Sequence, residues 1–149
     1  MLDVATLCKV CQDLSKSKTG ALIVITHTDD LAFFSESGVQ IDARMTIPLF
    51  KSIFYKNSPL HDGAVIIRDN KIVAARCVLP VTNNTDFPIH LGMRHRAAAG
   101  ISEDSDAIVI IVSEQNGEIA FAKEGKLQNQ CSGEKLEDLL NFEAKNINA

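Results

Sequence analysis

The sequence predicts a single α/β domain in which a central mixed β-sheet is flanked by helices. The chain has 149 residues, which fits one domain able to bury roughly two-thirds of its unfolded surface. Continuous apolar runs over 20–26 and 107–113 are typical of strands covered on both faces. Helical patterns and hairpin signals alternate with these runs, and no linker, internal repeat or low-complexity segment interrupts residues 1–149.

The first helix is predicted to begin after Asp3, a typical N-cap, and to end near Ser17. Cys8 and Cys11 lie on this helix at i, i+3 spacing. Because no second cysteine pair accompanies them, a buried position in the helix explains them better than a metal or redox site. No export signal opens the chain, so its four cysteines are expected to stay reduced.

Further elements are predicted between residues 20 and 60. A strand over 20–26 is followed by short strands over 31–34 and 39–43. Thr46 is expected to cap a second helix, because apolar residues recur after it at helical spacing.

The middle of the chain is predicted to form a hairpin, a long loop and a helix. Strands over 64–68 and 71–79 are joined by a turn at 69–70, where the sequence reads Asp-Asn. Residues 80–90 are the longest irregular stretch, and loops of this length in a compact domain often bear on function. A helix is expected over about 92–102.

The C-terminal part is predicted to add a hairpin and a last helix. The most apolar run, 107–113, is expected to be the central strand. Asn116-Gly117 is typical of a type I′ turn, which pairs this strand with residues 118–122. Ser132 is expected to cap a helix that runs to about residue 144.

Composition restricts the class of protein. The formal charge of −4 and the pI of 5.5 argue against a nucleic-acid binder held by a broad basic face. One tyrosine and no tryptophan leave little for base stacking. No apolar run approaches the roughly 20 residues of a membrane span, and no signal peptide is found, so we expect a cytoplasmic protein.

Two stretches carry the side chains best suited to chemistry. His61-Asp62-Gly63 places an imidazole and a carboxylate beside a glycine, which lets a ligand approach the backbone. Arg94-His95-Arg96 gathers basic side chains at an expected helix N-terminus, where free amides and guanidinium forks suit phosphate. Together they suggest phosphoryl chemistry.

Each stretch taken alone also has a structural explanation. The His-Asp-Gly spacing is by itself more typical of a plain turn, and salt bridges explain Arg94-His95-Arg96 equally well. Ser113-Glu114-Gln115 is either a hairpin turn or the ligand-binding end of a strand. His27 and His90 have no identifiable partner and are left as surface residues. The nucleotide-loop fingerprints GxxxxGK and GxGxxG are absent.

The combination of motifs resembles the diadenylate cyclase family. The matching segments are Leu60-His61-Asp62-Gly63-Ala64, Leu91-Gly92-x-Arg94-His95-Arg96 and Val112-Ser113-Glu114. The resemblance covers about residues 4–127, which form the core of the catalytic domain, and the helix over 132–144 follows it. It implies that two ATP molecules are joined into cyclic di-AMP with release of two pyrophosphates, by two chains that meet face to face.

Residue roles also follow from this resemblance. Asp62 would activate the ribose 3′-hydroxyl, while Arg94, His95 and Arg96 would hold or organise the phosphates. ATP contacts are implied for Gly63, Ala64, Leu79, Met93, Ser113 and Glu114. Leu79 would lie against the adenine, and Ser113 would touch the terminal phosphate. A divalent metal ion (Mn²⁺, Mg²⁺ or Co²⁺) would be held by His61, with Gln115 at a second family position for a ligand.

Three positions depart from the family pattern. Met93 replaces a usual threonine, Val78 stands where some members carry a tyrosine, and Gln115 replaces a glutamate that helps to bind the metal. A neutral amide is a weaker ligand for a hard cation than a carboxylate. The alternative hypothesis is therefore a catalytically impaired adenine-nucleotide-binding module of the same fold. The most similar family form has membrane helices ahead of this domain, so the chain is either naturally soluble or the cytoplasmic part of a membrane-anchored enzyme.

Overall fold

The computed structural model describes residues 1–84, 86–88 and 90–147. Two positions of the predicted 80–90 loop and the last two residues of the predicted 1–149 domain lie outside these ranges. The described residues form one seven-stranded sheet in the order β2-β4-β3-β1-β5-β6-β7. The strands are β1 (Ala21–Ile25), β2 (Val39–Arg44), β3 (Ala64–Arg68), β4 (Lys71–Cys77), β5 (Ile108–Val112), β6 (Ile119–Lys123) and β7 (Lys126–Cys131). The helices are α1 (Val4–Lys16), α2 (Ala32–Ser35), α3 (Ile47–Phe54), α4 (Met93–Glu103) and α5 (Gly133–Ile147).

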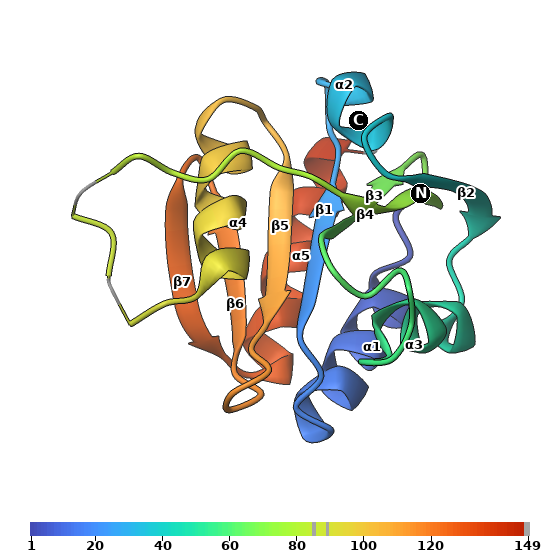
Figure 1. Cartoon of the computed structure of the whole chain (residues 1–149), viewed down its shortest axis with the longest axis horizontal. Helices are drawn as coiled ribbons and strands as arrows, with labels where there is room; N and C mark the ends of the chain where they lie inside the picture. The colour runs from blue at the N-terminus through green and yellow to red at the C-terminus, as the bar shows by residue number, and fades with distance from the viewer. Residues whose placement is uncertain (85, 89, 148–149) are drawn as a thin grey trace.

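The predicted fold class is confirmed, because helices cover both faces of a mixed sheet (Figure 1). β1 and β3 run parallel, whereas the other neighbouring strands are antiparallel. Side chains alternate across each strand, so Ile23 and Ile25 pack with α1, α3 and α5. Leu22 and Val24 face the opposite way, toward the side covered by α4.

The predicted helix caps are confirmed. Asp3 Oδ1 accepts a hydrogen bond from the Thr6 amide at 3.1 Å, and Thr46 Oγ1 accepts one from the Leu49 amide at 3.2 Å. Ser132 Oγ accepts one from the amide of Lys135 at 3.0 Å. Each cap satisfies an amide that the first turn of its helix leaves without a partner.

The first-helix cysteines are buried and free, as predicted. Burial raises the pKa of the Cys8 thiol to about 11, and Glu137 raises it further. A thiol with so high a pKa is a weak nucleophile and a poor metal ligand at neutral pH. The pair therefore acts as part of the core.

The strand predicted over 31–34 is wrong, because α2 occupies this segment. Two acidic side chains start the helix. Asp29 Oδ1 accepts a hydrogen bond from the Leu31 amide, and Asp30 Oδ1 accepts one from the Ala32 amide, both at 3.0 Å. Such local side-chain bonds favour turns and helix starts over a strand ladder.

The predicted pairing of residues 107–113 with 118–122 is confirmed by β5 and β6, but the type I′ turn is wrong. That turn needs a positive φ at both central residues, and here only Gly117 has one, at 76°. The Ser113 carbonyl accepts from the Gly117 amide and the Glu118 carbonyl from the Ser113 amide. The turn is thus longer, and it holds residues 114–117 at the end of β5.

Two further features of the sheet differ from the prediction. The central strand is β1 rather than β5, although β5 is its neighbour. The edge strand β7 was not predicted, because it reads as polar and only its last residue is buried. Glu124 and Gly125 join it to β6 with positive φ angles of 54° and 79°, which is typical of a tight hairpin.

The described residues 78–84, 86–88 and 90–92 lie between β4 and α4 in the chain and are called the strap here; residues 78–84 leave β4 and pass across the face of the molecule that carries α4 (Figure 1). The Thr82 amide donates to the Arg96 carbonyl at 3.1 Å, and the Thr82 hydroxyl pairs with Glu103. Gly100 makes this close approach possible, since a Cβ there would lie 2.2 Å from the Pro80 carbonyl oxygen. The strap is therefore seated directly on the helix.

Candidate active site

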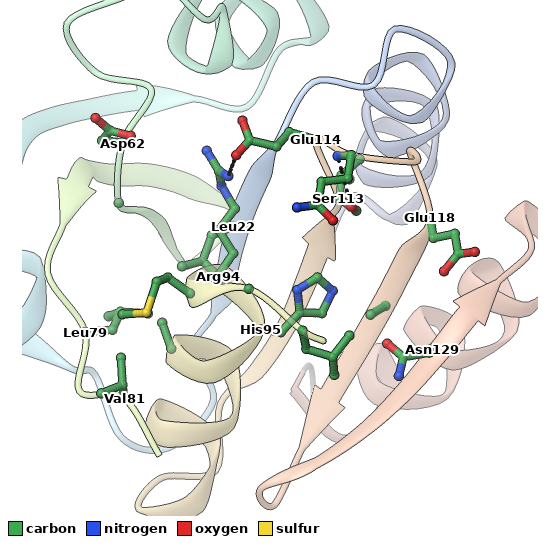
Figure 2. Close-up of a pocket in the computed structure, with 18 of the residues that line it drawn as sticks. Leu22, Asp62, Leu79, Val81, Arg94, His95, Ser113, Glu114, Glu118 and Asn129 are labelled. Atoms are coloured by element: carbon green, nitrogen blue, oxygen red, sulfur yellow. Dashed lines mark hydrogen bonds and ion pairs between the residues drawn. The ribbon is translucent and has the colours of Figure 1, made fainter. Parts of the chain in front are cut away.

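A cavity of about 760 Å³ lies between the strap, the N-terminus of α4 and one end of the strands β5, β6 and β7 (Figure 2). This volume is in the range of pockets that hold a small-molecule ligand. Among the sequence-predicted residues, its lining includes His61, Asp62, Gly63, Leu79, Met93, Arg94, His95, Ser113, Glu114 and Gln115. Stretches far apart in the sequence are thus brought to one site.

The turn before β3 presents His61 and Asp62 at one side of the cavity. His61 Nδ1 lies 2.8 Å from the Ser58 carbonyl oxygen, which can only accept, so Nδ1 is the donor of this hydrogen bond. His61 Nε2 is 3.3 Å from Asp62 Oδ1. The Asp62 side chain is 74% exposed, so a ligand can reach its carboxylate directly.

Gly63 is required for this turn on two grounds. Its φ is +86°, a conformation that side chains rarely adopt, and a Cβ would lie 2.7 Å from the Cys77 carbonyl oxygen. The chain can therefore press against β4 at this point and leave Asp62 facing outward.

Arg94 is the cation at the centre of the cavity. Its Nη1 lies 3.4 Å from Glu114 Oε1, across the space between α4 and the end of β5 (Figure 2). Its guanidinium packs against Gly20, where an added Cβ would lie 2.6 Å away. Among the described residues, Arg94 Nε is buried and has no hydrogen-bond partner. Buried donors are normally paired, so this one indicates an acceptor that a ligand would bring.

The N-terminus of α4 adds further donors. Gly92 is its N-cap and provides no side-chain hydrogen bond to the first turn. Gly92, Met93 and Arg94 all line the cavity. The exposed amides and the positive end of the helix dipole favour an anion here.

His95 lies deeper in the same wall and is buried. Burial lowers the pKa of its imidazole, and the charges of Arg94 and His90 lower it further, while Glu118 opposes them. The neutral imidazole is therefore favoured at pH 7, and a phosphate placed beside it would favour the protonated form.

The end of β5 supplies the opposite wall. Ser113 Oγ accepts hydrogen bonds from the Gln115 amide at 3.2 Å and the Asn116 amide at 3.5 Å. These bonds leave the hydroxyl proton of Ser113 free to be donated to a ligand. The Glu114 side chain is 66% exposed and, within the described part of the chain, its carboxylate pairs with Arg94 alone, so it can move when a ligand takes the guanidinium.

Apolar side chains form the part of the cavity under the strap. Leu22 lies at its floor, and Leu79 and Val81 come from the strap itself (Figure 2). Val78 and Met93, at two positions that depart from the family pattern, are 70% and 66% exposed at its mouth. A flat heterocycle such as a purine fits this kind of surface.

Two of the predicted site residues are not among the described residues that line the cavity. Arg96 turns toward the strap, where its guanidinium carbon lies 5.0 Å above the Phe87 ring. Ala64 is fully buried in β3. In this geometry Arg96 supports the strap through a cation–π contact, and Ala64 supports the turn from within the core.

The structure also brings residues to the cavity that the sequence did not single out. They include His90, which the sequence analysis left as a surface residue, together with Glu118, which precedes β6, and Asn129 and Gln130 of β7. Asn129 and Glu118 lie across the cavity from Asp62 (Figure 2). Recognition of the Glu124-Gly125 turn would have revealed β7 and with it the amide-bearing residues of this wall.

The side chains around the cavity include one histidine suited to bind a divalent metal ion. Within the described residues, no group of three or more His, Cys, Asp or Glu side chains converges on a metal position. His61 nevertheless has the arrangement of a metal-binding imidazole, because its Nδ1 is fixed by the Ser58 carbonyl and its Nε2 is directed to the cavity side beside Asp62. Such a site fits an ion that takes its remaining ligands from substrate phosphates and water.

Comparison with protein families and curated proteins gives consistent matches. The family model described as DisA bacterial checkpoint controller nucleotide-binding matches residues 8–127. Diadenylate cyclase CdaS of Bacillus thuringiensis is 47% identical over 116 residues, which is 78% of this chain and 58% of that protein. Cyclic di-AMP synthase CdaA of Bacillus subtilis is 39% identical over 142 residues, which is 95% of this chain and 52% of that protein. The chain thus spans about half the length of these relatives.

Solved structures agree with the fold. DacA from Staphylococcus aureus, crystallised as a double mutant, superposes with a TM-score of 0.92 at 40% identity, covering 98% of this chain and 95% of that one. A protein described as a hypothetical membrane spanning protein from Bacillus cereus superposes with a TM-score of 0.82 at 44% identity. It covers 85% of this chain and 62% of that one.

Proposed function

This chain belongs to the diadenylate cyclase family of DisA-type nucleotide-binding domains, and we propose that it is a nucleotidyltransferase that joins two ATP molecules into cyclic di-AMP. The observation that carries the proposal is the Arg94 guanidinium, which lines a cavity that also presents Asp62 and whose Nε has no partner among the described residues. An anionic ligand can pair with this guanidinium, and a ligand hydroxyl can reach the carboxylate.

The same bonds form and break in each of the two condensations. The 3′-hydroxyl of one ATP gives its proton to the Asp62 carboxylate, and its oxygen forms a bond to the α-phosphorus of the other ATP. The bond from that phosphorus to the β-phosphate oxygen breaks, and pyrophosphate leaves. Asp62 is exposed at the cavity wall and is the base with the most direct access to such a hydroxyl.

The other residues bind and orient the triphosphate. Arg94, the amides at the start of α4 and the Ser113 hydroxyl donate hydrogen bonds to phosphate oxygens, and His95 can add a further donor. Leu79 and Val81 cover the adenine from the strap. His61 would hold a divalent cation, with the Gln115 amide as a weaker second ligand, and such a cation supplies positive charge to the phosphates.

Product analysis tests this proposal. The protein is incubated with ATP and Mn²⁺ or Mg²⁺, and the nucleotides are separated by chromatography and identified by mass. We expect cyclic di-AMP from the wild type. The Asp62→Asn variant should retain ATP binding and lose activity by about 10²- to 10⁴-fold, because asparagine keeps the shape and removes the proton acceptor. Turnover by Asp62→Asn within a few-fold of wild type would show that Asp62 is not the base.

The alternative function is an adenine-nucleotide-binding module without turnover. The departures at Met93 and Gln115 favour it, whereas the access to Asp62 favours the enzyme. The same assay separates the two, because the module binds ATP, for example in a calorimetric titration, and forms no cyclic product with any of the three metal ions.

Two copies of the chain are required by the proposed chemistry. The described residues hold one Asp62 turn and one Arg94 cluster around a single cavity of this size. Each ATP must both attack and be attacked, and a two-fold pairing of cavities gives both ATP molecules the same two roles. We therefore propose a face-to-face homodimer in which each cavity holds one ATP.

The proposal also includes attachment of the domain to a membrane. None of the described helices is long and apolar enough to cross a bilayer. The similar protein of Bacillus cereus is described as membrane spanning, and this supports a domain that works on the cytoplasmic side of a membrane, carried by an anchor elsewhere in the protein. Fractionation of cells that express the native gene tests it, with the protein expected in the membrane pellet.

A further inference from the structure

A second groove of about 400 Å³ continues from the cavity on the outer side of the Asp62 turn. It shares Asp62, Gly63 and Val78 with the cavity, so the carboxylate stands at the junction of the two spaces. The rest of its lining comes from the start of β2 and from Arg76 on β4.

Arg76 is placed in the groove by an irregularity of β4. Ala64 of β3 pairs with Cys77, whereas Ile66 pairs with Ala74, so β4 has one residue more than β3 over this stretch. Arg76 lies in the resulting bulge with a φ of +56°, which is uncommon for a residue other than glycine. Bulges beside active sites typically redirect one side chain, and here the side chain is a cation.

The Arg76 guanidinium is exposed and carries an available charge. Its Nη1 donates a long hydrogen bond of 3.5 Å to the Pro59 carbonyl, which places it over the turn that carries Asp62. In the described part of the chain it forms no ion pair with a carboxylate. Arg94, in contrast, is paired with Glu114 within the cavity. Arg94 thus lines the cavity and Arg76 lines the groove, and Asp62 lines both.

We propose that Arg76 binds the α-phosphate region of the second ATP, the one held by the partner copy, as it approaches the 3′-hydroxyl at Asp62. This inference rests on the proposed function. The attacked phosphate is anionic and must come close to a carboxylate base, so a cation at the outer side of that base offsets the repulsion. Arg94 serves the nucleotide of its own cavity, and Arg76 serves the nucleotide that enters from the partner.

Substitution of Arg76 by glycine tests the role without straining the bulge, because glycine readily adopts a positive φ. We expect cyclic di-AMP formation by Arg76→Gly to fall about 10- to 100-fold, as for the loss of a hydrogen bond to a charged group. The affinity of the diluted protein for ATP should stay within about twofold, since the cavity is unchanged. Arg76→Lys should retain part of the rate, because it keeps the charge.

Arg44→Ala is the matched control, because Arg44 is an exposed arginine at the end of β2 that lines neither space. Its rate should equal that of the wild type. A rate for Arg76→Gly within threefold of wild type would overturn the inference, as would a loss of ATP affinity equal to the loss of rate. If the wild type itself made no cyclic product, the proposed function would fail instead, so the two failures are distinguishable.

Mixed chains test whether Arg76 acts on the partner's nucleotide. One condensation alone gives a linear dinucleotide that keeps a 5′-triphosphate. The proposal places Arg76 and Asp62 of one chain in the same condensation. In a pair of one Asp62→Asn chain and one Arg76→Gly chain, the first chain then impairs one condensation and the second chain impairs the other. This mixture should then form linear dinucleotide about 10- to 100-fold more slowly than wild type mixed with Asp62→Asn. Equal rates in the two mixtures would place Arg76 on its own chain's nucleotide and contradict the proposal.

Discussion

At the scale of single residues, the cavity combines one fixed imidazole, one exposed carboxylate and one guanidinium with an unpaired nitrogen. His61 is held by the Ser58 carbonyl, Asp62 is open to a ligand, and Arg94 is packed against Gly20. These three environments differ in what they offer a ligand: an imidazole nitrogen, an anionic acceptor and a donor. The differences fit the separate roles proposed for them in metal binding, proton transfer and phosphate binding.

The proposed ligands predict which metal ion supports the highest rate. With a histidine nitrogen and an amide oxygen in place of a carboxylate, Mn²⁺ or Co²⁺ should support a higher initial rate than Mg²⁺. Gln115→Glu should lower the concentration of each metal ion that gives half-maximal rate. Titration of each ion against initial rate in both proteins measures this. Superimposable Mg²⁺ and Mn²⁺ curves in both proteins would be incompatible with the assigned ligands.

The protonation of His95 predicts a dependence of stability on pH. Its pKa is lowered in the folded state by burial, so below about pH 6.5 the unfolded chain binds a proton that the folded chain does not. Stability should therefore fall as pH falls through this range. His95→Gln lacks the group, so its melting temperature should drop less than that of the wild type between about pH 7.5 and 5.5. An equal drop in both proteins would show that His95 does not contribute.

At the scale of elements, the site is built where three irregular connections meet the sheet. The 61–63 turn enters β3, the strap joins β4 to α4, and the 114–117 turn joins β5 to β6. Each is held by backbone contacts, such as the Gly63 approach to Cys77 and the Gly100 approach to Pro80. The rigid sheet thus fixes the ends of segments that carry the functional side chains.

The Gly100→Ala variant tests the close packing of the strap against α4. Alanine would stabilise an isolated helix by about 1 kcal/mol relative to glycine, but its Cβ would lie 2.2 Å from the Pro80 carbonyl oxygen. We expect a net destabilisation of about 1–3 kcal/mol, as for other overpacked sites, together with weaker ATP binding because Leu79 and Val81 move with the strap. Denaturant unfolding and nucleotide titration measure the two effects, and unchanged values in both would contradict this packing.

Most of the regular elements could be predicted from the sequence, because capping residues and apolar periodicity act locally. Asp3, Thr46 and Ser132 set helix starts in this way. The strand predicted over 31–34 was wrong because the carboxylates of Asp29 and Asp30 bind nearby amides and favour a helix start. Strand β7 was missed because an exposed edge strand has no apolar alternation.

The site was predictable only in part, for a related reason. Motifs identify residue types, but the direction of a side chain depends on tertiary contacts. Arg94 and Arg96 are two residues apart on α4 and therefore point to different sides of the helix, one into the cavity and the other to Phe87. The β4 bulge that redirects Arg76 depends on pairing with β3, which no local pattern reveals.

At the scale of the whole molecule, the cavity opens beside the Asp62 turn, where the proposed reaction requires the 3′-hydroxyl of one ATP to meet a second nucleotide. One chain presents one such cavity among its described residues. The central claim is therefore that two copies, each with one ATP, form cyclic di-AMP together.

The dependence of specific activity on protein concentration tests this claim most directly. Cyclic di-AMP and pyrophosphate are measured in the same reactions over a dilution series that reaches nanomolar protein, with ATP and Mn²⁺ in excess. We expect two pyrophosphates for each cyclic di-AMP and an activity per chain that rises with protein concentration before it levels off. An activity per chain that stays constant down to nanomolar protein, with a monomer seen by light scattering under the same conditions, would contradict it.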